Sequence, residues 1–168
     1  MQSALTACLV AGMGLAASAQ SFYNLDFEQA RLIPVSGDPY GRVDFGAALP
    51  GWIGYCGIYA QGLANYDFEF LDSAGISIFD SKDTIEPVAG VTHGRYCACL
   101  YSGVVLGTMN VYVDTSIAQT GWIPASATSI LFNFCNSWSW GYADVSVTFN
   151  GISIPLSVVS GGEPAPAF

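Results

Sequence analysis

Charged residues are scarce in this chain, and basic residues are the scarcest of them. Only 10% of its 168 residues are charged, against roughly 25% in ordinary soluble domains. Four Lys and Arg stand against 13 Asp and Glu, and this formal net charge of −9 excludes nucleic acid as a partner, because phosphate backbones are bound by Lys and Arg. The hydrophobic share of 52% excludes an intrinsically disordered chain, and the length suits one domain.

Patterns that mark common catalytic sites are also missing. The sequence contains no P-loop, no dinucleotide-binding glycine pattern, no H-E-x-x-H zinc motif and no G-x-S-x-G nucleophile elbow. The single histidine, His93, precedes a glycine and a predicted strand, which is typical of a turn residue. Asp67 and Glu69 would share one strand face, whereas the carboxylates of a glycosidase stand about 5–9 Å apart across a cleft. We therefore expect a non-catalytic protein.

The first 19 residues have the composition of a secretory signal peptide. Residues 1–19 carry no charge, consist mainly of Ala, Leu, Val, Gly and Met, and end in Ala17-Ser18-Ala19, a small-x-small cleavage site. No basic residue precedes the apolar run, which departs from the usual pattern. The run is shorter than the about 20 residues that a membrane-spanning helix needs. We expect export to the cell surface or beyond, with no membrane span in the mature chain.

Short β-branched and aromatic runs, separated by Gly, Asn, Asp and Pro, make up the rest of the chain. The predicted strands are residues 21–28, 51–60, 66–70, 75–79, 95–101, 111–116, 129–134, 143–149 and 152–159. Residues 31–50 are expected to form a long loop. Asn150-Gly151 lies between the last two strands, and this dipeptide predicts a hairpin with a type I′ turn. The pattern predicts an all-β, antiparallel β-sandwich of the jelly-roll type over residues 20–160, followed by a loop-like tail, 161–168.

Two groups of residues resemble a known family. The segment 22–30, which contains Phe27-Glu28, and the later Leu49-Pro50-Gly51-Trp52 are similar to the opening of galactose-binding-like jelly-roll domains, which include secreted relatives of carbohydrate-binding modules. Residues 116–132 resemble a segment of exported bacterial proteins of the PEP-CTERM type, notably from Verrucomicrobia and Planctomycetes. The resemblance implies a glycan-binding jelly roll. Relatives usually continue into further strands and an apolar anchor, so this likeness also implies a chain that is shortened at its C-terminus.

The same resemblance implies a structural calcium ion. In galactose-binding-like domains the glutamate of the FE pair commonly helps to hold calcium, and here that residue is Glu28. Calcium takes about six to eight oxygen ligands, so Glu28 would need helpers such as Asp26, Asp38 and Asp44. The alternative is that the Glu28 carboxylate accepts hydrogen bonds from loop N–H groups and needs no metal.

Alternating aromatic residues provide a candidate carbohydrate site. Trp138, Trp140 and Tyr142 would share one face if the chain is extended there, and aromatic rings stack on the apolar faces of sugars. The alternative is that one or both tryptophans fill the core, where Trp52 is also expected.

Cysteine usage agrees with an exported chain. Removal of the signal peptide leaves Cys56, Cys97, Cys99 and Cys135, whose three possible pairings the sequence does not distinguish. Their spacing is unlike that of a zinc site, so one disulfide or buried thiols are expected.

These patterns together predict an exported, non-catalytic β-sandwich that binds a glycan or extracellular polysaccharide. A structural protein of the cell surface or matrix, without a discrete ligand site, is the alternative. A glycan-active enzyme comes third.

Overall fold

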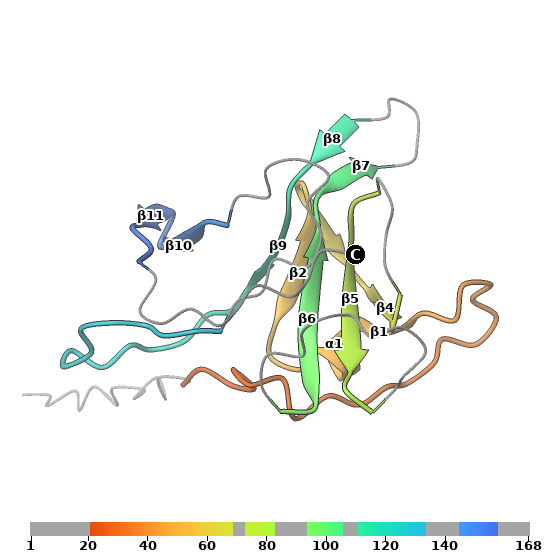
Figure 1. Ribbon diagram of the computed structural model, residues 1–168, viewed down its shortest axis with the longest axis horizontal. Coiled ribbons are helices and arrows are strands. Elements are labelled where there is room, and N and C mark those ends of the chain that lie inside the picture. Colours follow the sequence, from red (N-terminus) through yellow and green to blue (C-terminus); the bar gives the residue numbers. More distant parts are fainter. Residues whose placement is uncertain (1–20, 69–72, 83–93, 106–110, 134–144, 158–168) are drawn as a thin grey trace, which may run out of the picture.

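The computed structural model describes residues 21–68, 73–82, 94–105, 111–133 and 145–157 (Figure 1). The predicted signal peptide, residues 1–19, and the predicted tail, residues 161–168, lie outside these ranges. Within the described ranges, no helix has the length and apolar character needed to cross a membrane.

β-Strands account for nearly all the regular structure of the described residues. The elements are β1 (Val43–Asp44), α1 (Phe45–Ala48), β2 (Ile53–Cys56), β3 (Tyr59–Gln61), β4 (Leu63–Tyr66), β5 (Gly75–Asp80), β6 (Tyr96–Tyr101), β7 (Gly103–Val105), β8 (Val111–Val113), β9 (Thr115–Ala118), β10 (Val147–Phe149) and β11 (Ile152–Ile154). One sheet has the order β1-β4-β5-β6 and another the order β3-β2-β9. Two-stranded ladders join β7 to β8 and β10 to β11. The pairing of β4 with β5 is parallel and the other pairings are antiparallel. The predicted all-β class is confirmed.

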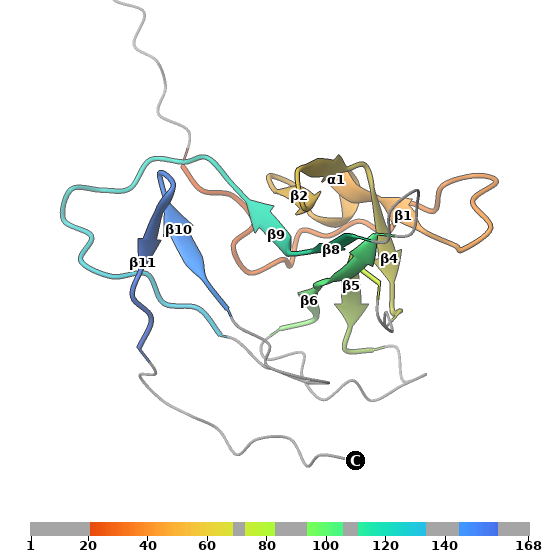
Figure 2. The ribbon, with the colours of Figure 1, turned by 90° about the horizontal axis from the view of Figure 1, so that it is seen from above.

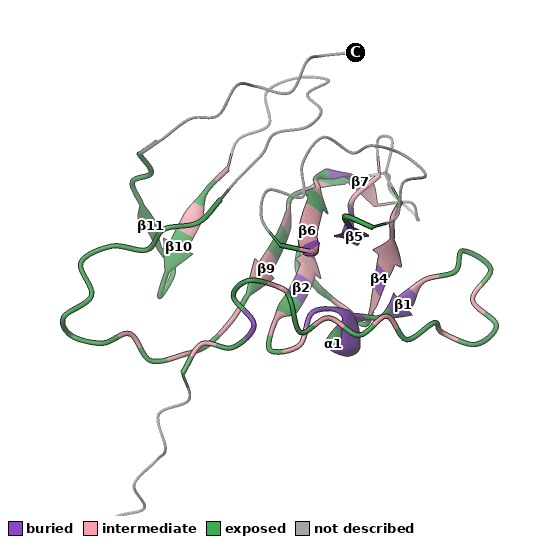
Figure 3. Cartoon of the chain, turned by 60° about the horizontal axis from the view of Figure 1, so that its bottom comes forward, coloured by how far each residue is buried: buried purple, intermediate pink, exposed green. Residues whose placement is uncertain are grey.

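The core lies on the face of the larger sheet that α1 covers. All six residues of β5 are buried, as expected for a strand with neighbours on both edges and cover on both faces. Figure 3 shows buried residues gathered in α1 and in the strands beside it. The buried apolar cluster consists of Val43, Phe45, Ala48, Leu49, Ala64, Ile76, Ile78 and Tyr96.

The two larger sheets approach each other most closely at Gly54 of β2. A Cβ atom at this position would lie 2.5 Å from Ile76 Cδ1 and 2.5 Å from Phe45 Cε2. In two perpendicular views β2 and β9 lie on one side and β5 and β6 on the other, so the sheets form two layers (Figures 1 and 2). The absence of a side chain at position 54 therefore sets the spacing between the layers.

The two-stranded ladder of β7 and β8 connects strands that belong to different layers. The chain runs from β6 through Ser102 into β7, and from β8 through Asp114 into β9. β7 and β8 pair with each other, while β6 pairs with β5 and β9 pairs with β2. At the point where β6 leads into β7 and β8 leads into β9, two hydrogen bonds join the two segments. The Thr115 hydroxyl donates to the Tyr101 carbonyl at 2.6 Å, and the Thr115 N–H donates to Ser102 Oγ at 3.2 Å. These bonds fix the corner at which the chain changes sheets.

The predicted hairpin at Asn150-Gly151 is confirmed. Both residues have positive φ, 49° and 76°, as a type I′ turn requires, and β10 pairs with β11. The hairpin lies to one side of the two main layers (Figure 2). β11 ends at Ile154, directly before Pro155, which has no N–H to donate to a ladder.

Several predicted local structures are wrong. Residues 21–28 form turns and not a strand, because Asn24 and Phe27 adopt positive φ values of 54° and 62°. The predicted single strand over 51–60 is a hairpin of β2 and β3 that turns at Gly57, where φ is 60°.

Two longer segments also differ from their predictions. The predicted loop 31–50 contains β1 and α1. The Asp44 side chain caps α1 by accepting a hydrogen bond from the Ala47 N–H at 2.8 Å, which stabilises this helical turn. Residues 129–133 form no strand, although their sequence is β-prone.

The close approach at Gly54 makes a direct test possible. We expect Gly54→Ala to lower the free energy of unfolding by about 1–3 kcal/mol in urea titrations, because the added methyl group overpacks the contact with Phe45 and Ile76. Gly62→Ala is the matched control, since nothing lies within 4 Å of a Cβ there. Equal stability of the two variants would show that the layers are not in contact at Gly54.

Candidate functional site

The residues that carry the family resemblance hold the N-terminal segment against the rest of the molecule. Gln119 is the first such residue. Its Oε1 accepts a hydrogen bond from the Tyr23 N–H at 2.8 Å, and its Nε2 donates to the carbonyl oxygens of Tyr23 at 2.7 Å and Gly51 at 2.9 Å. One amide thus joins three segments that are distant in sequence.

Trp52 makes a second attachment of the N-terminal segment. Its Nε1 donates to the Asn24 carbonyl at 2.9 Å, and its ring lies 5.6 Å from the ring of Phe27. Asn24 Nδ2 donates in turn to the Pro50 carbonyl at 3.3 Å. Trp52 packs against the buried cluster, which agrees with the core position expected for it.

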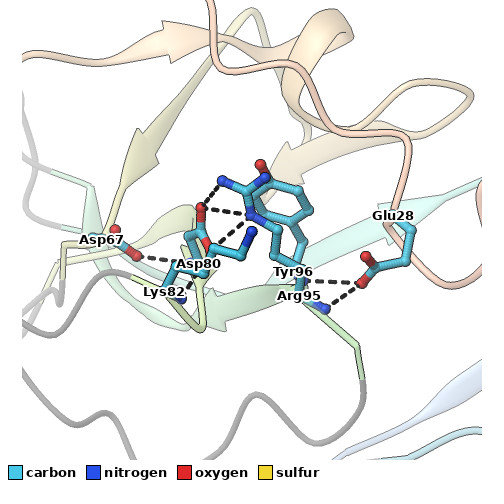
Figure 4. Close-up of polar contacts among 6 residues, drawn as sticks. All are labelled: Glu28, Asp67, Asp80, Lys82, Arg95 and Tyr96. Atoms are coloured by element: carbon cyan, nitrogen blue, oxygen red, sulfur yellow. Dashed lines mark hydrogen bonds and ion pairs between the residues drawn. The ribbon is translucent and has the colours of Figure 1, made fainter.

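Glu28, the predicted calcium ligand, forms the third attachment. Its Oε1 accepts hydrogen bonds from the backbone N–H groups of Arg95 at 2.6 Å and Tyr96 at 3.0 Å (Figure 4). This arrangement agrees with the alternative to calcium predicted from the sequence, in which the Glu28 carboxylate accepts hydrogen bonds from backbone N–H groups.

The other predicted calcium ligands are distributed among separate turns. Asp26 Oδ1 accepts a hydrogen bond from the Glu28 N–H at 3.2 Å, and Asp44 caps α1. Asp38 accepts from Arg42 at 2.6 Å as an ion pair, and this guanidinium lowers the pKa of Asp38 from 3.8 to about 2. In the described part of the chain, no group of three or more His, Cys, Asp and Glu side chains is placed to hold a metal. Calcium binding by Glu28, Asp26, Asp38 and Asp44 stays a prediction from the resemblance.

An ion pair that the sequence did not predict closes the end of the β5–β6 ladder. Arg95 Nε lies 3.0 Å from both carboxylate oxygens of Asp80, and its Nη2 lies 2.6 Å from Oδ2. The Asp80 side chain is only 3% exposed, and Arg95 lies over the Tyr96 ring at 4.7 Å (Figure 4). The Arg95 hydrogen bonds hold the pKa of Asp80 below its usual range.

The same end of the ladder includes two further contacts. The Asp80 N–H donates to Asp67 Oδ1 at 2.9 Å, and the Lys82 N–H donates to Asp80 Oδ1 at 2.9 Å. Burial, as the largest influence, raises the pKa of the Tyr96 hydroxyl. The carboxylates here are acceptors for protein donors, so this cluster is a structural clamp.

A shallow groove over the paired strands β2 and β9 is the candidate binding surface. It opens to solvent, has a cavity volume of about 260 Å³ and is lined by Gly51, Ile53, Tyr55, Ala118, Gln119 and Thr120. Gly54 and Cys56 are buried, and side chains alternate along a strand, so Ile53 and Tyr55 lie on the outer face of the sheet. Ile53 pairs with Ala118 across the ladder.

The groove combines apolar surface with uncharged polar groups. Ile53 is 51% exposed, and Tyr55 is partly buried. Thr120 and Tyr55 contribute hydroxyl groups, and Gln119 contributes its amide oxygen. An aromatic ring beside a few polar groups is suited to a ligand with an apolar face and hydroxyl groups at its edge. Local sequence patterns do not reveal this site, because its residues come from two segments that are distant in sequence.

The predicted aromatic platform lies outside the described residues. Trp138, Trp140 and Tyr142 therefore remain predicted carbohydrate-binding residues, and His93 and Cys135 also fall outside these ranges.

The remaining cysteines lie on two strands. Cys56 is buried on β2, where burial raises the pKa of its thiol, and Thr115 Oγ1 lies 3.9 Å from its Sγ. Cys97 and Cys99 lie on β6, opposite Phe79 and Ser77.

Replacement of Glu28 tests its role as an attachment of the N-terminal segment. We expect Glu28→Ala to lower the free energy of unfolding by about 1 kcal/mol, because two backbone donors lose their acceptor, and Glu28→Gln to lower it less, since an acceptor oxygen remains. The midpoint of thermal unfolding, measured in calcium and in chelator, tests the calcium prediction: an equal midpoint supports hydrogen bonding of Glu28 without a metal. If chelator lowers the midpoint of the wild type but not of Glu28→Ala, Glu28 binds calcium.

The Asp80–Arg95 pair predicts a pH-dependent effect. A carboxyl group whose pKa is lowered by folding stabilises the native state above its ordinary pKa, here 3.8, and loses this effect as the pH falls toward the folded value. We therefore expect Asp80→Asn to destabilise the protein at pH 7 and to differ less from the wild type below about pH 4. Asp114→Asn, at an exposed position, is the control. A pH-independent difference for Asp80→Asn would contradict the role given to the charge.

Comparisons of the chain with family models, with curated proteins and with solved structures give no match. The likeness to galactose-binding-like domains therefore remains a prediction from the sequence, and function is argued from the geometry.

Proposed function

We propose that this protein is an exported, non-catalytic binding module for glycans, and that the groove over β2 and β9 is one of its contact surfaces. The observation that supports this proposal most strongly is the groove itself, with the Tyr55 ring beside Gln119 and Thr120. A sugar ring offers both an apolar face and hydroxyl groups, which match these two kinds of surface.

The open shape of the groove favours binding over catalysis. Its volume of about 260 Å³ is below the roughly 300–1,000 Å³ of pockets that enclose a small ligand. A site that is shallow and open can contact a segment of a longer chain, but it excludes little water from a reacting bond.

The state of the carboxylates also supports a non-catalytic role. Glu28, Asp44 and Asp80 each accept hydrogen bonds from backbone N–H groups, and Asp80 also pairs with Arg95. A general acid must hold a proton near neutral pH, whereas the pKa of Asp80 is lowered.

Two further parts of the proposal rest on the sequence. Residues 1–19 have the pattern of a signal peptide, and export would place the groove where extracellular polysaccharide is present. The two facing sheets are compatible with a jelly roll, and Trp138, Trp140 and Tyr142 are proposed as a second contact surface for the same glycan.

Substitution of Tyr55 tests the groove as a glycan site. We expect Tyr55→Ala to weaken binding to an immobilised glycan panel about tenfold, which is about 1.4 kcal/mol, and Tyr55→Phe to retain the stacking part of the affinity. Tyr112→Ala is the matched control, since Tyr112 is a 70% exposed tyrosine on another strand, β8.

The other outcomes distinguish the remaining possibilities. Loss of binding in the Trp138→Ala, Trp140→Ala double variant, with Tyr55→Ala unchanged, would move the site to the tryptophan platform. Absence of binding to every glycan would favour the structural protein of the cell surface or matrix.

A further inference from the structure

We infer that the groove over β2 and β9 selects uncharged polysaccharides and discriminates against uronic-acid and sulfated polymers. This inference rests on the proposed function and adds the class of glycan. It comes from the hydrogen-bonding state of one groove residue and from the distribution of charge.

Gln119 lines the groove and has no amide proton left to donate to a ligand. Both of its amide protons are engaged, because Nε2 donates to the carbonyl oxygens of Tyr23 and Gly51. Its Oε1 accepts one hydrogen bond, from the Tyr23 N–H, which leaves a second lone pair. A sugar hydroxyl can donate a proton to this oxygen. An ionised carboxylate or sulfate has no proton to donate and would place negative charge against an acceptor.

Among the described residues that line the groove, there is no cation that could offset this repulsion. These six residues are all uncharged, and recognition of carboxylate or sulfate groups in proteins depends on Arg, Lys or oriented N–H groups. A polymer of anionic sugars would therefore lose water from its charged groups and gain in return only the hydroxyl donors of Tyr55 and Thr120.

The charge of the rest of the chain adds to the same preference. Two of its four basic residues, Arg42 and Arg95, are paired with Asp38 and Asp80, so they present little net positive charge. With a formal net charge of −9, the protein repels a polyanion at low salt. A neutral polymer is not subject to this repulsion.

The size of the groove limits how much of the polymer it holds. A volume of about 260 Å³ that is open to solvent accommodates part of a chain, so affinity for a free monosaccharide should be low. Because a polymer offers many repeated units, avidity should make the protein bind the polymer more strongly than the monosaccharide.

Affinity electrophoresis of the full chain in gels that contain one polymer each tests the inference. The neutral probes are a β-glucan, a mannan, a xylan and a galactan, and the anionic probes are polygalacturonate, alginate and heparin. We expect retardation by at least one neutral polymer that changes less than twofold between about 50 and 500 mM salt, since no charges are paired on binding. Tyr55→Ala should remove most of the retardation, and Tyr112→Ala should leave it intact.

Two results would overturn the inference in distinguishable ways. If an anionic polymer retards the protein as strongly as a neutral one, and salt weakens this effect, the class of glycan is wrong but glycan binding stands. If no polymer in either group retards the protein, the proposed function itself fails.

Discussion

The fit of Phe45 and Ile76 against the bare backbone of Gly54 is the contact on which the two-layer arrangement depends. It brings α1, β2 and β5 together at one point, and the buried cluster extends outward from there. Because interiors are packed at high density, an added methyl group would have to displace a ring or an isoleucine. The outer face of β2, and with it the groove, takes its position from this inner contact.

Polar side chains bound to backbone groups then fasten the N-terminal segment across the layers. Glu28 and Trp52 belong to the stretches that resemble galactose-binding-like domains, and Gln119 belongs to the stretch that resembles exported proteins of the PEP-CTERM type. Each of the three forms hydrogen bonds to segments distant in sequence. Their shared role is to hold the fold together, since none of these bonds requires a ligand. Such residues can recur among proteins that bind different sugars, or none, because they are constrained by architecture.

The sequence predicted the strand class and the terminal hairpin because these depend on local patterns. Alternation and the Asn150-Gly151 pair act over a few residues, and both are visible in the chain. The turns at Asn24 and Phe27 were missed because strand-like alternation was overridden by contacts with residues 50–52. The groove and the Asp80–Arg95 clamp were missed because pairing of distant strands creates them.

β9, one of the two strands that pair with β2, is synthesised well after β2 itself. Residues 53–56 pair with residues 115–118, so during synthesis the β2–β3 hairpin leaves the ribosome long before β9 can join it. Through that interval one edge of β2 has free N–H and C=O groups, and an open edge is a template for pairing with another chain. Few charges are available nearby to discourage such contacts, and folding dominated by distant pairings is slow. The time between the synthesis of β2 and that of β9 is therefore when a nascent chain of this sequence is most open to misassociation.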